Sequence, residues 1–349
     1  MTLVVVDADV LGRRRTGDET YVRNLLRTLP EPAAEAGLEL AAVTRRRELV
    51  PPGIEAIELR ARSQELRMAW TLPRLLRRLG ADLVHTQYAL PLRSPCPGIV
   101  TIHDLSFEDA SLMRARDRHV FRAVVPRAAR AAARVVTVSE RTKRDLLDRY
   151  GLSPEQVVVT PNGVDPAFGP TFDPLQGGRT ASNSLLQAPY VLAVGALERR
   201  KNQQAALEAA KEVGLELVVV GPVKDQRVAD ELRRGGARLE GYVSDERLAE
   251  LYRGAACLVQ PSRHEGFGLP VLEAMASGTP VVAVSDPALV EVAGDAAVVV
   301  EKRGLADGIR RALDERETLV AAGLERARRF SWEETARATV RVYLEALRR

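Results

Sequence analysis

Two glutamates, Glu265 and Glu273, flank a turn in the stretch PSRHEGFGLPVLEAMASGTPVVAV of residues 261–284. Two glycines lead into Pro270 and a helix-period apolar run, and proline suits a helix start because its missing N–H costs nothing there. Free N–H groups at such a start can bind phosphate, and carboxylates accept hydrogen bonds from sugar hydroxyls. The pattern predicts a site for a ligand with an anionic centre and polyhydroxylated ends. It is also typical of an α/β core with two solvated glutamates.

A basic pair, Arg200 and Lys201, follows an apolar strand in the string VGALERRKNQ. Cations beside a helix start are unfavourable unless an anion joins them. A guanidinium and an ammonium at this place could hold two phosphates and neutralise the charge on a departing diphosphate. The pair therefore favours an anion site over ordinary solvated charges.

His103 follows an expected strand over 99–102 in the string TIHDLSF. Open α/β folds bind their ligands at the carboxyl ends of such strands. A lone histidine is more often a structural residue, so position alone leaves both interpretations open.

Short Val-rich runs alternate with amphipathic stretches along the chain, which is the pattern of parallel sheets covered by helices. The first half is expected to hold strands near 3–6, 38–43, 54–59, 82–85, 99–102, 135–138 and 157–160, and helices over 19–29, 64–79, 117–132 and 140–150. Strands near 190–194, 217–220, 237–239, 257–260, 280–284 and 297–300 follow, with helices near 203–213, 225–233, 245–252, 270–277 and 305–329. Between the halves, a stretch rich in Pro, Gly, Ser and Asn predicts a linker.

The string from Glu265 to Glu273 resembles the Glu-x7-Glu signature of the retaining glycosyltransferases of family 4, and its continuation EAMASGTPVVAV matches them as well. The glycine loop ending in Gly-x-x-x-Tyr, here Gly17 to Tyr21, the string H-D-L at His103 and PNGVD are also similar to family strings. One departure is Arg199, which stands where the family has proline before Arg-Lys-Asn.

The resemblance implies an α/β chain with the GT-B fold, in which two Rossmann-like, doubly wound domains face an interdomain cleft. It implies an acceptor-side domain over 1–165, completed by a C-terminal helix over 332–349. A linker over 166–189 and a nucleotide-sugar donor domain over 190–331 complete the chain.

The family also implies roles for the site residues. Its members place the counterparts of Arg200 and Lys201 on the donor diphosphate, of His103 and Glu265 on the donor sugar, and of Glu273 on the ribose. The remaining donor-binding positions are the loop glycine Gly17, the base-bordering stretch Gly241, Tyr242 and Val243, and the backbone of Phe267, Gly268 and Leu269.

No metal site is predicted. Asp7 and Asp9 form the D-x-D pattern that holds a cation in other glycosyltransferases, but they end the first strand, where the match is coincidental. The two cysteines are far apart and no His/Cys cluster occurs, so we expect metal-independent transfer with no cofactor. The nucleoside-diphosphate sugar is the co-substrate.

The charge of the chain is uneven: up to Asp165, 26 basic residues oppose 21 acidic ones, giving +5, whereas the remainder has 25 against 26, giving −1. A basic first half suits a phosphorylated or lipid-linked acceptor, or a membrane surface, as does the stretch MAWTLPRLLRRL; ordinary solvated arginines and a core helix are equally compatible. Nucleic acid is discounted, because no binding motif accompanies the charge and aromatic residues make up only 4%.

The expected function is transfer of a hexose to a glycan, glycolipid or small-molecule acceptor, with GDP-mannose the preferred donor. Alternatives are a GT-B relative that releases a sugar phosphate or epimerises a nucleotide sugar, and a non-catalytic partner subunit. A NAD-dependent dehydrogenase is disfavoured because the first turn, GRRRTGDETY, lacks the dinucleotide fingerprint. With no signal peptide or long apolar run, we expect a cytoplasmic protein, with the inner membrane face as an alternative location.

Overall fold

The computed structural model describes residues 2–13, 16–61, 63–113, 115–169, 189–301 and 303–348. It divides into two compact units: unit 1 comprises Met1–Gly163 with Trp332–Arg349, and unit 2 comprises Val164–Ser331. Most of the expected linker, residues 170–188, lies outside the described residues, while Pro166–Phe168 form a short 3-10 helix, η4.

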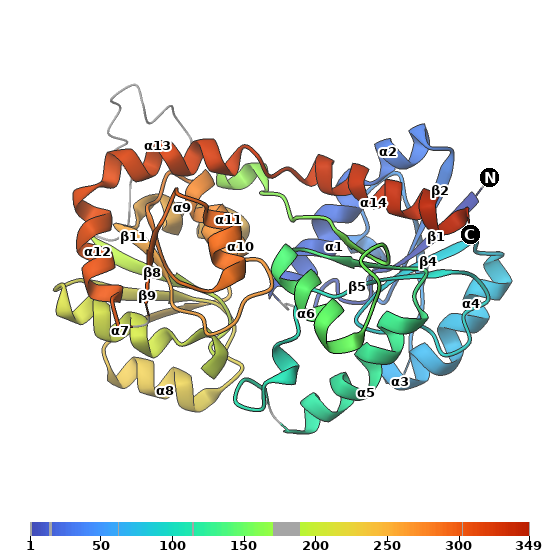
Figure 1. The fold of residues 1–349 in the computed structure, drawn as a ribbon, viewed down its shortest axis with the longest axis horizontal. Helices are drawn as coiled ribbons and strands as arrows, with labels where there is room; N and C mark the ends of the chain where they lie inside the picture. The colour runs from blue at the N-terminus through green and yellow to red at the C-terminus, as the bar shows by residue number, and fades with distance from the viewer. Residues whose placement is uncertain are drawn as a thin grey trace. The chain divides into compact units, whose positions relative to one another are not determined.

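Unit 1 is built on a parallel sheet whose described strands run in the order β3-β2-β1-β4-β5-β6-β7 (Figure 1). The strands are β1 (Thr2–Asp7), β2 (Leu38–Thr44), β3 (Glu55–Glu58), β4 (Leu83–Gln87), β5 (Gly98–Thr101), β6 (Arg134–Thr137) and β7 (Val157–Val159). Its helices are α1 (Thr16–Thr28), α2 (Pro30–Glu35), α3 (Gln64–Leu66), α4 (Leu72–Leu79), α5 (Ala115–Ala131), α6 (Glu140–Tyr150) and α14 (Trp332–Leu347), with 3-10 turns η1 (Arg47–Leu49) and η3 (Ser106–Glu108).

The C-terminal helix α14 belongs to this unit. It packs against α1 and α2, as Figure 1 shows in red and blue, and against β4, β5 and β6. Its buried face includes Trp332, Val340 and Tyr343.

Unit 2 repeats the plan with a second parallel sheet of order β10-β9-β8-β11-β12-β13. Its strands are β8 (Tyr190–Val194), β9 (Glu216–Val220), β10 (Arg238–Gly241), β11 (Cys257–Gln260), β12 (Val281–Val284) and β13 (Val298–Val300). The helices are η6 (Arg199–Lys201), α7 (Gln203–Glu212), α8 (Gln226–Arg234), α9 (Asp245–Gly254), α10 (Leu269–Ala276), α11 (Pro287–Ala293), α12 (Leu305–Asp314) and α13 (Arg316–Ala327). The α/β class is thus confirmed for both halves.

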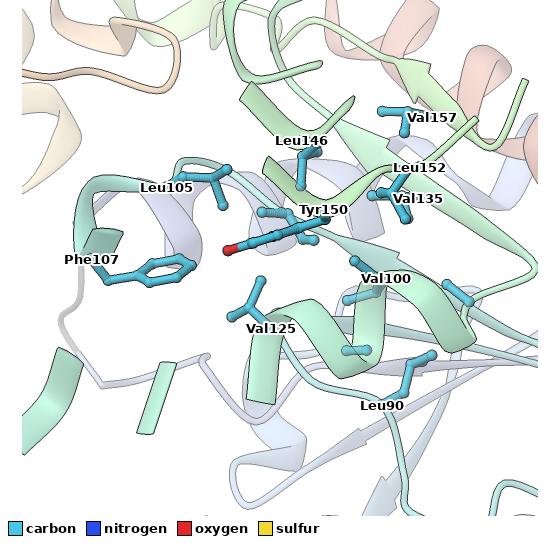
Figure 2. Close-up of a cluster of buried hydrophobic side chains, with 14 residues drawn as sticks. Leu90, Val100, Leu105, Phe107, Val125, Val135, Leu146, Tyr150, Leu152 and Val157 are labelled. Carbon is cyan, nitrogen blue, oxygen red and sulfur yellow. The ribbon is translucent and has the colours of Figure 1, made fainter. Parts of the chain in front are cut away.

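Apolar side chains on both faces of the first sheet explain why its strands are Val-rich, since a parallel sheet is covered by helices on each side. Figure 2 shows one cluster, in which the ring of Tyr150 lies among Leu146, Val125 and Leu105. The Tyr150 hydroxyl donates to Glu108 Oε1 at 2.8 Å, so its polar end is satisfied at the edge of the cluster.

Three helical predictions need correction. The segment predicted as one helix over 64–79 is interrupted by a π-helical turn, η2 (Arg67–Thr71), between α3 and α4. The segment 305–329 is two helices, α12 and α13, that meet at Glu315. Helices α2 and α11 were missed because both are short, although Asp286 caps α11 by accepting from the Ala288 N–H at 3.0 Å.

Candidate active site

The basic pair and the first glutamate lie at the point of unit 2 where the strand order reverses. Strand β8 lies between β9 and β11, so the connections after β8 and β11 leave in opposite directions along the sheet. Open α/β sheets bind ligands at this point, outside the carboxyl ends of the strands. Here η6, with Arg200 and Lys201, follows β8, and the loop containing Glu265 follows β11.

The structure brings these three side chains into contact. Lys201 Nζ donates to Glu265 Oε1 at 2.6 Å, and Arg200 Nη1 lies 3.6 Å from Glu265 Oε2. Arg200 also donates to the carbonyl of His264 at 2.9 Å and to Glu198 Oε1 at 3.0 Å. Arg200, the arginine named in the predicted basic pair, therefore contacts this glutamate.

Glu265 is buried, and Arg200 and Lys201 are partly buried beside it. Burial alone would raise the pKa of Glu265, but the charges of Lys201 and Arg200 outweigh it and lower that pKa to about 2. Burial lowers the pKa of Lys201, and the carboxylate of Glu265 offsets part of this effect. Glu198 is bonded to Arg200, and Lys224 Nζ lies 3.9 Å from Glu198 Oε2, so three cations face two carboxylates. The remaining positive charge suits an incoming anion.

Gln260 is a residue of this site that the sequence analysis missed. Its side-chain amide donates to Glu265 Oε1 at 2.7 Å and to Ser262 Oγ at 3.1 Å. The only signal in the sequence is its place as the last, polar residue of an otherwise apolar strand, β11.

Helix α10 begins as the sequence predicts, after Gly268 and with Pro270 in its first turn. Gly268 adopts a φ of 110°, and a Cβ at this position would lie 2.8 Å from Leu289 Cδ2, so glycine is required here. The flanking Phe267 is buried and Leu269 is partly exposed. The residue directly before helix α10 therefore carries no side chain, which lets the backbone pass close to Leu289.

Glu273 lies in the second turn of α10 and is buried. Its Oε2 accepts a hydrogen bond from the Tyr252 hydroxyl at 2.8 Å. Burial, and then the charge of Glu273, raise the pKa of Tyr252 well above its ordinary value. The tyrosine, on α9, is a second residue that the sequence did not single out.

Three neighbouring strands end in glycines with positive φ: Gly195 after β8, Gly221 after β9, and Gly241 at the end of β10. A Cβ on Gly221 would lie 2.1 Å from the Gly195 carbonyl oxygen, and one on Gly195 would lie 3.3 Å from Lys201 Cε. The three strand ends therefore form a floor without side chains, and Tyr242, 48% exposed, and Val243 follow directly from it. Such a floor lets a ligand approach the backbone.

In unit 1, His103 lies just beyond the carboxyl end of β5, and its ring is held on several sides. Gln87, the last residue of β4, places its amide oxygen 3.0 Å from His103 Nε2. The rings of Tyr21 and Tyr88 lie with their centroids 4.8 Å and 5.7 Å from the imidazole. Thr142 donates to the main-chain carbonyl of His103 at 3.2 Å, so both side chain and backbone are fixed.

The surroundings keep the imidazole neutral. Burial lowers the pKa of His103, and the nearby carboxylates of Asp18 and Asp104 offset only part of that effect. Tyr88 has a φ of 58°, which a non-glycine residue seldom adopts, and such strain concentrates at functional sites. Gln87, Tyr88 and Thr142 were all missed. The pairing of β4 with β5 brings Gln87 and Tyr88 next to His103, and Thr142 comes from helix α6.

Helix α1 begins at Thr16, three residues before its predicted start at Glu19, so Gly17 lies in the first helical turn. Gly17 is exposed and a Cβ there would meet no atom within 4 Å. Arg14 and Arg15, in the loop before it, lie outside the described residues.

The carboxylates of the D-x-D pattern are occupied by arginines. Asp7 pairs with the fully buried Arg67 at 2.5 Å, while Asp9 pairs with Arg13 and, at 3.0 Å, with Arg45. Within the described part of the chain, no group of three His, Cys, Asp or Glu side chains is arranged to hold a metal ion.

Two families match the chain. Residues 15–168 match the family described as Glycosyltransferase Family 4, and residues 179–330 match Glycosyl transferases group 1. The O-antigen chain mannosyltransferase B of Escherichia coli is 30% identical over 264 residues, covering 70% of this chain and 69% of the relative. A D-inositol 3-phosphate glycosyltransferase of Geodermatophilus obscurus is 34% identical, covering 76% of this chain and 66% of the relative.

Solved structures share the fold along the whole chain. Sucrose-phosphate synthase from Thermosynechococcus elongatus superposes with a TM-score of 0.77 at 23% identity, covering 99% of both chains. Anabaena HepE in complex with UDP and glucose gives a TM-score of 0.74 at 15% identity, again covering 99% of both chains. These likenesses show a GT-B fold, in which each half is a Rossmann-like domain.

Proposed function

We propose that this chain, which belongs to the glycosyl transferases group 1 family and has the GT-B fold, transfers a hexose from a nucleoside-diphosphate sugar to an acceptor hydroxyl with retention of configuration. The observation that carries the proposal is the contact of Lys201 and Arg200 with Glu265 at the strand-order reversal of unit 2. A partly buried cationic pair there is suited to the negative charge that grows on a departing diphosphate.

For the donor, Arg200 and Lys201 would bind the diphosphate and Glu265 the sugar hydroxyls, beside the backbone of Phe267, Gly268 and Leu269. Glu273 would accept from the ribose hydroxyls while Tyr252 orients its carboxylate at 2.8 Å. The glycine floor leads to Gly241, Tyr242 and Val243, which would border the base. In unit 1, His103 would hydrogen-bond the donor sugar and Gly17 would lie along the diphosphate.

The reaction breaks the bond between the sugar's anomeric carbon and the diphosphate oxygen, and forms a bond to the acceptor oxygen on the same face. The acceptor proton passes to a diphosphate oxygen, so atoms and charge balance without a protein base. The two cations supply the electrostatic stabilisation, and we propose that transfer needs neither a metal ion nor a cofactor.

GDP-mannose is the proposed donor, supported by the O-antigen chain mannosyltransferase that is 30% identical to this chain. The acceptor would be a glycan, a glycolipid or a small molecule. Transfer at the cytoplasmic side, with a peripheral contact to a membrane, is proposed because unit 1 carries the basic surplus of the chain.

The proposal is tested by replacing Lys201 or Glu273 with alanine and assaying sugar transfer from GDP-mannose, UDP-glucose and UDP-N-acetylglucosamine. Loss of Lys201 removes a charge that acts on the leaving group, so we expect kcat to fall by roughly 100-fold or more. Loss of Glu273 should mainly weaken donor binding, which a smaller ligand-induced rise in Tm would report.

The matched controls are Lys211→Ala on α7 and Glu231→Ala on α8, two exposed residues away from the site. Transfer close to the unsubstituted rate in K201A or E273A would refute the site assignment. Products formed from donor alone would point instead to an epimerase or phosphate-releasing relative, and binding without turnover to a partner subunit.

A further inference from the structure

The segment from Leu66 to Leu79 has one face in the core and another in solvent. Met68, Leu72, Leu75 and Leu76 are buried in a cluster on the sheet of unit 1. The opposite stripe is exposed: Leu66 is 43% and Trp70 55% exposed. Residues four apart lie on one helical face, so Leu66, Trp70 and Arg74 follow one another along this stripe.

The π-helical turn is bonded to a third exposed apolar residue, Leu92. The Leu72 N–H bonds to the carbonyl of Arg67, five residues back, and Pro73 has no N–H to offer. The carbonyl of Met68 instead accepts from the Leu92 N–H at 3.1 Å. This bond holds the backbone of Leu92, a residue that is 54% exposed, against the π-helical turn.

Cations surround the apolar residues. The Arg74 guanidinium lies 3.5 Å above the centroid of the Trp70 ring, and Arg77 donates to the Arg93 carbonyl at 3.4 Å. Arg77, Arg78 and Arg93 are exposed, and none of them pairs with a carboxylate among the described residues. The nearest acid along the stripe is Glu65, whose pKa is lowered chiefly by its hydrogen bond to Ser63.

We propose that this face docks on an anionic phospholipid bilayer. Its members, which we call the Trp70 surface, are Leu66, Trp70, Arg74, Arg77, Arg78, Leu92 and Arg93. An exposed tryptophan and leucines beside unpaired arginines fit the boundary between lipid headgroups and acyl chains. Charge complementarity selects a bilayer that carries anionic lipid, and docking does not depend on the proposed transfer reaction.

The fluorescence of Trp70 can itself report whether this surface contacts lipid. The chain has two tryptophans, and Trp332 is only 1% exposed whereas Trp70 is 55% exposed. Adding vesicles of phosphatidylcholine with phosphatidylglycerol to the full-length protein should shift the emission to shorter wavelength, and brominated lipid should quench it. Vesicles of phosphatidylcholine alone should give a much smaller change.

Two variants and a salt dependence locate the contact. In Trp70→Phe the vesicle-dependent emission change should disappear, because the buried Trp332 does not report it. Arg77→Gln with Arg78→Gln should weaken co-sedimentation with anionic vesicles by roughly fivefold per arginine removed. High salt should weaken binding further, since the Debye length falls from about 10 Å at 0.1 M to about 3 Å at 1 M.

The matched control is the triple variant Leu313→Ser, Arg310→Gln, Arg311→Gln on α12, which removes one exposed leucine and two arginines from unit 2. It should bind vesicles as the unsubstituted protein does. Vesicle binding without a change in Trp70 emission, or equal loss in the control, would overturn the proposal. So would a dimer in gel filtration that Trp70→Ser dissociates, because a second copy would then cover the face. Nucleotide-induced Tm shifts should persist in every variant, which separates this proposal from the proposed function.

Discussion

The tautomer of His103 follows from a single contact. The oxygen of the Gln87 amide lies 3.0 Å from Nε2, and an oxygen can only accept, so Nε2 carries the proton. Among the described residues none hydrogen-bonds to Nδ1, so the lone pair of this nitrogen is the open acceptor of the ring. If His103 bonds a donor-sugar hydroxyl, it does so through Nδ1, and Gln87 acts as a positioning residue.

We therefore expect Gln87→Leu to lower kcat by roughly 10- to 100-fold, because the ring loses the bond that fixes its orientation. Gln87→Glu keeps an acceptor at Nε2 and should restore most of the rate, while the added charge raises the pKa of His103 and shifts the pH profile upward. Nitrogen-15 NMR of the imidazole should show the Nε2–H form in the native protein. Gln226→Leu on α8 is the control, and equal kcat for it and Gln87→Leu would refute the positioning role.

At this scale the sequence predicted residue types better than their partners. Arg200, Lys201 and Glu265 were identified from their local strings, but the 2.6 Å bond joins residues 64 positions apart. That contact depends on β8 and β11 being neighbours in the sheet, which no local pattern specifies. The same applies to Gln87 and His103 at the ends of β4 and β5.

Among the elements, the glycines at the ends of β8 and β9 impose a steric constraint on substitution. Gly221 has a φ of 146°, and a Cβ there would lie 2.1 Å from the Gly195 carbonyl oxygen. Gly221→Ala should therefore cost about 2–4 kcal/mol in free energy of unfolding, and should weaken nucleotide binding by separating β8 from β9. Urea denaturation and nucleotide titration measure the two effects.

Gly236→Ala is the matched control, since Gly236 has a φ of 85° but open space around its Cβ position. Only backbone strain of about 1–2 kcal/mol is expected there. Equal destabilisation by the two substitutions would show that the close approach of Gly221 to Gly195 does not matter.

The strands and most helices followed from composition, because Val-rich runs and helical periodicity are local properties. The sequence did not predict where the long helices are interrupted. Pro73 was not recognised as a break in the predicted helix. It leaves one carbonyl of the π-helical turn without a helical partner, and the Leu92 N–H from a distant loop satisfies that carbonyl, which no local pattern indicates. The sequence left open whether this segment is a core helix or a surface helix. In the structure it is buried on one face and exposed on the other.

Over the whole molecule, both ends of the chain belong to unit 1, and His85 on β4 bonds to the C-terminal helix α14. His85 Nδ1 lies 2.7 Å from the Tyr343 hydroxyl on α14, and Nε2 lies 2.7 Å from Thr101 Oγ1. Burial, with a smaller effect of His103, lowers the pKa of His85 from 6.5 to about 3. The folded unit therefore keeps His85 neutral where the unfolded chain would bind a proton.

This difference in proton binding makes the stability of unit 1 depend on pH in a known direction. Between pH 6.5 and about 3, the unfolded state holds one more proton at His85, so the stability of unit 1 falls as the pH falls. From pH 6.5 to pH 5 the loss should be about 2 kcal/mol, at 1.36 kcal/mol for each pH unit. Both tryptophans belong to unit 1, so urea unfolding followed by their fluorescence reports this unit specifically.

His85→Asn is the decisive comparison, because asparagine does not titrate. The variant should be less stable at pH 7, where it leaves the buried Tyr343 hydroxyl poorly satisfied, yet it should lose about 2 kcal/mol less than the unsubstituted protein between pH 6.5 and pH 5. An unchanged pH slope would mean that other groups in unit 1 dominate its acid sensitivity. Because the bond to Tyr343 joins α14 to β4, a smaller slope in His85→Asn would show that protonation of one buried side chain weakens the packing of the C-terminal helix on the N-terminal sheet.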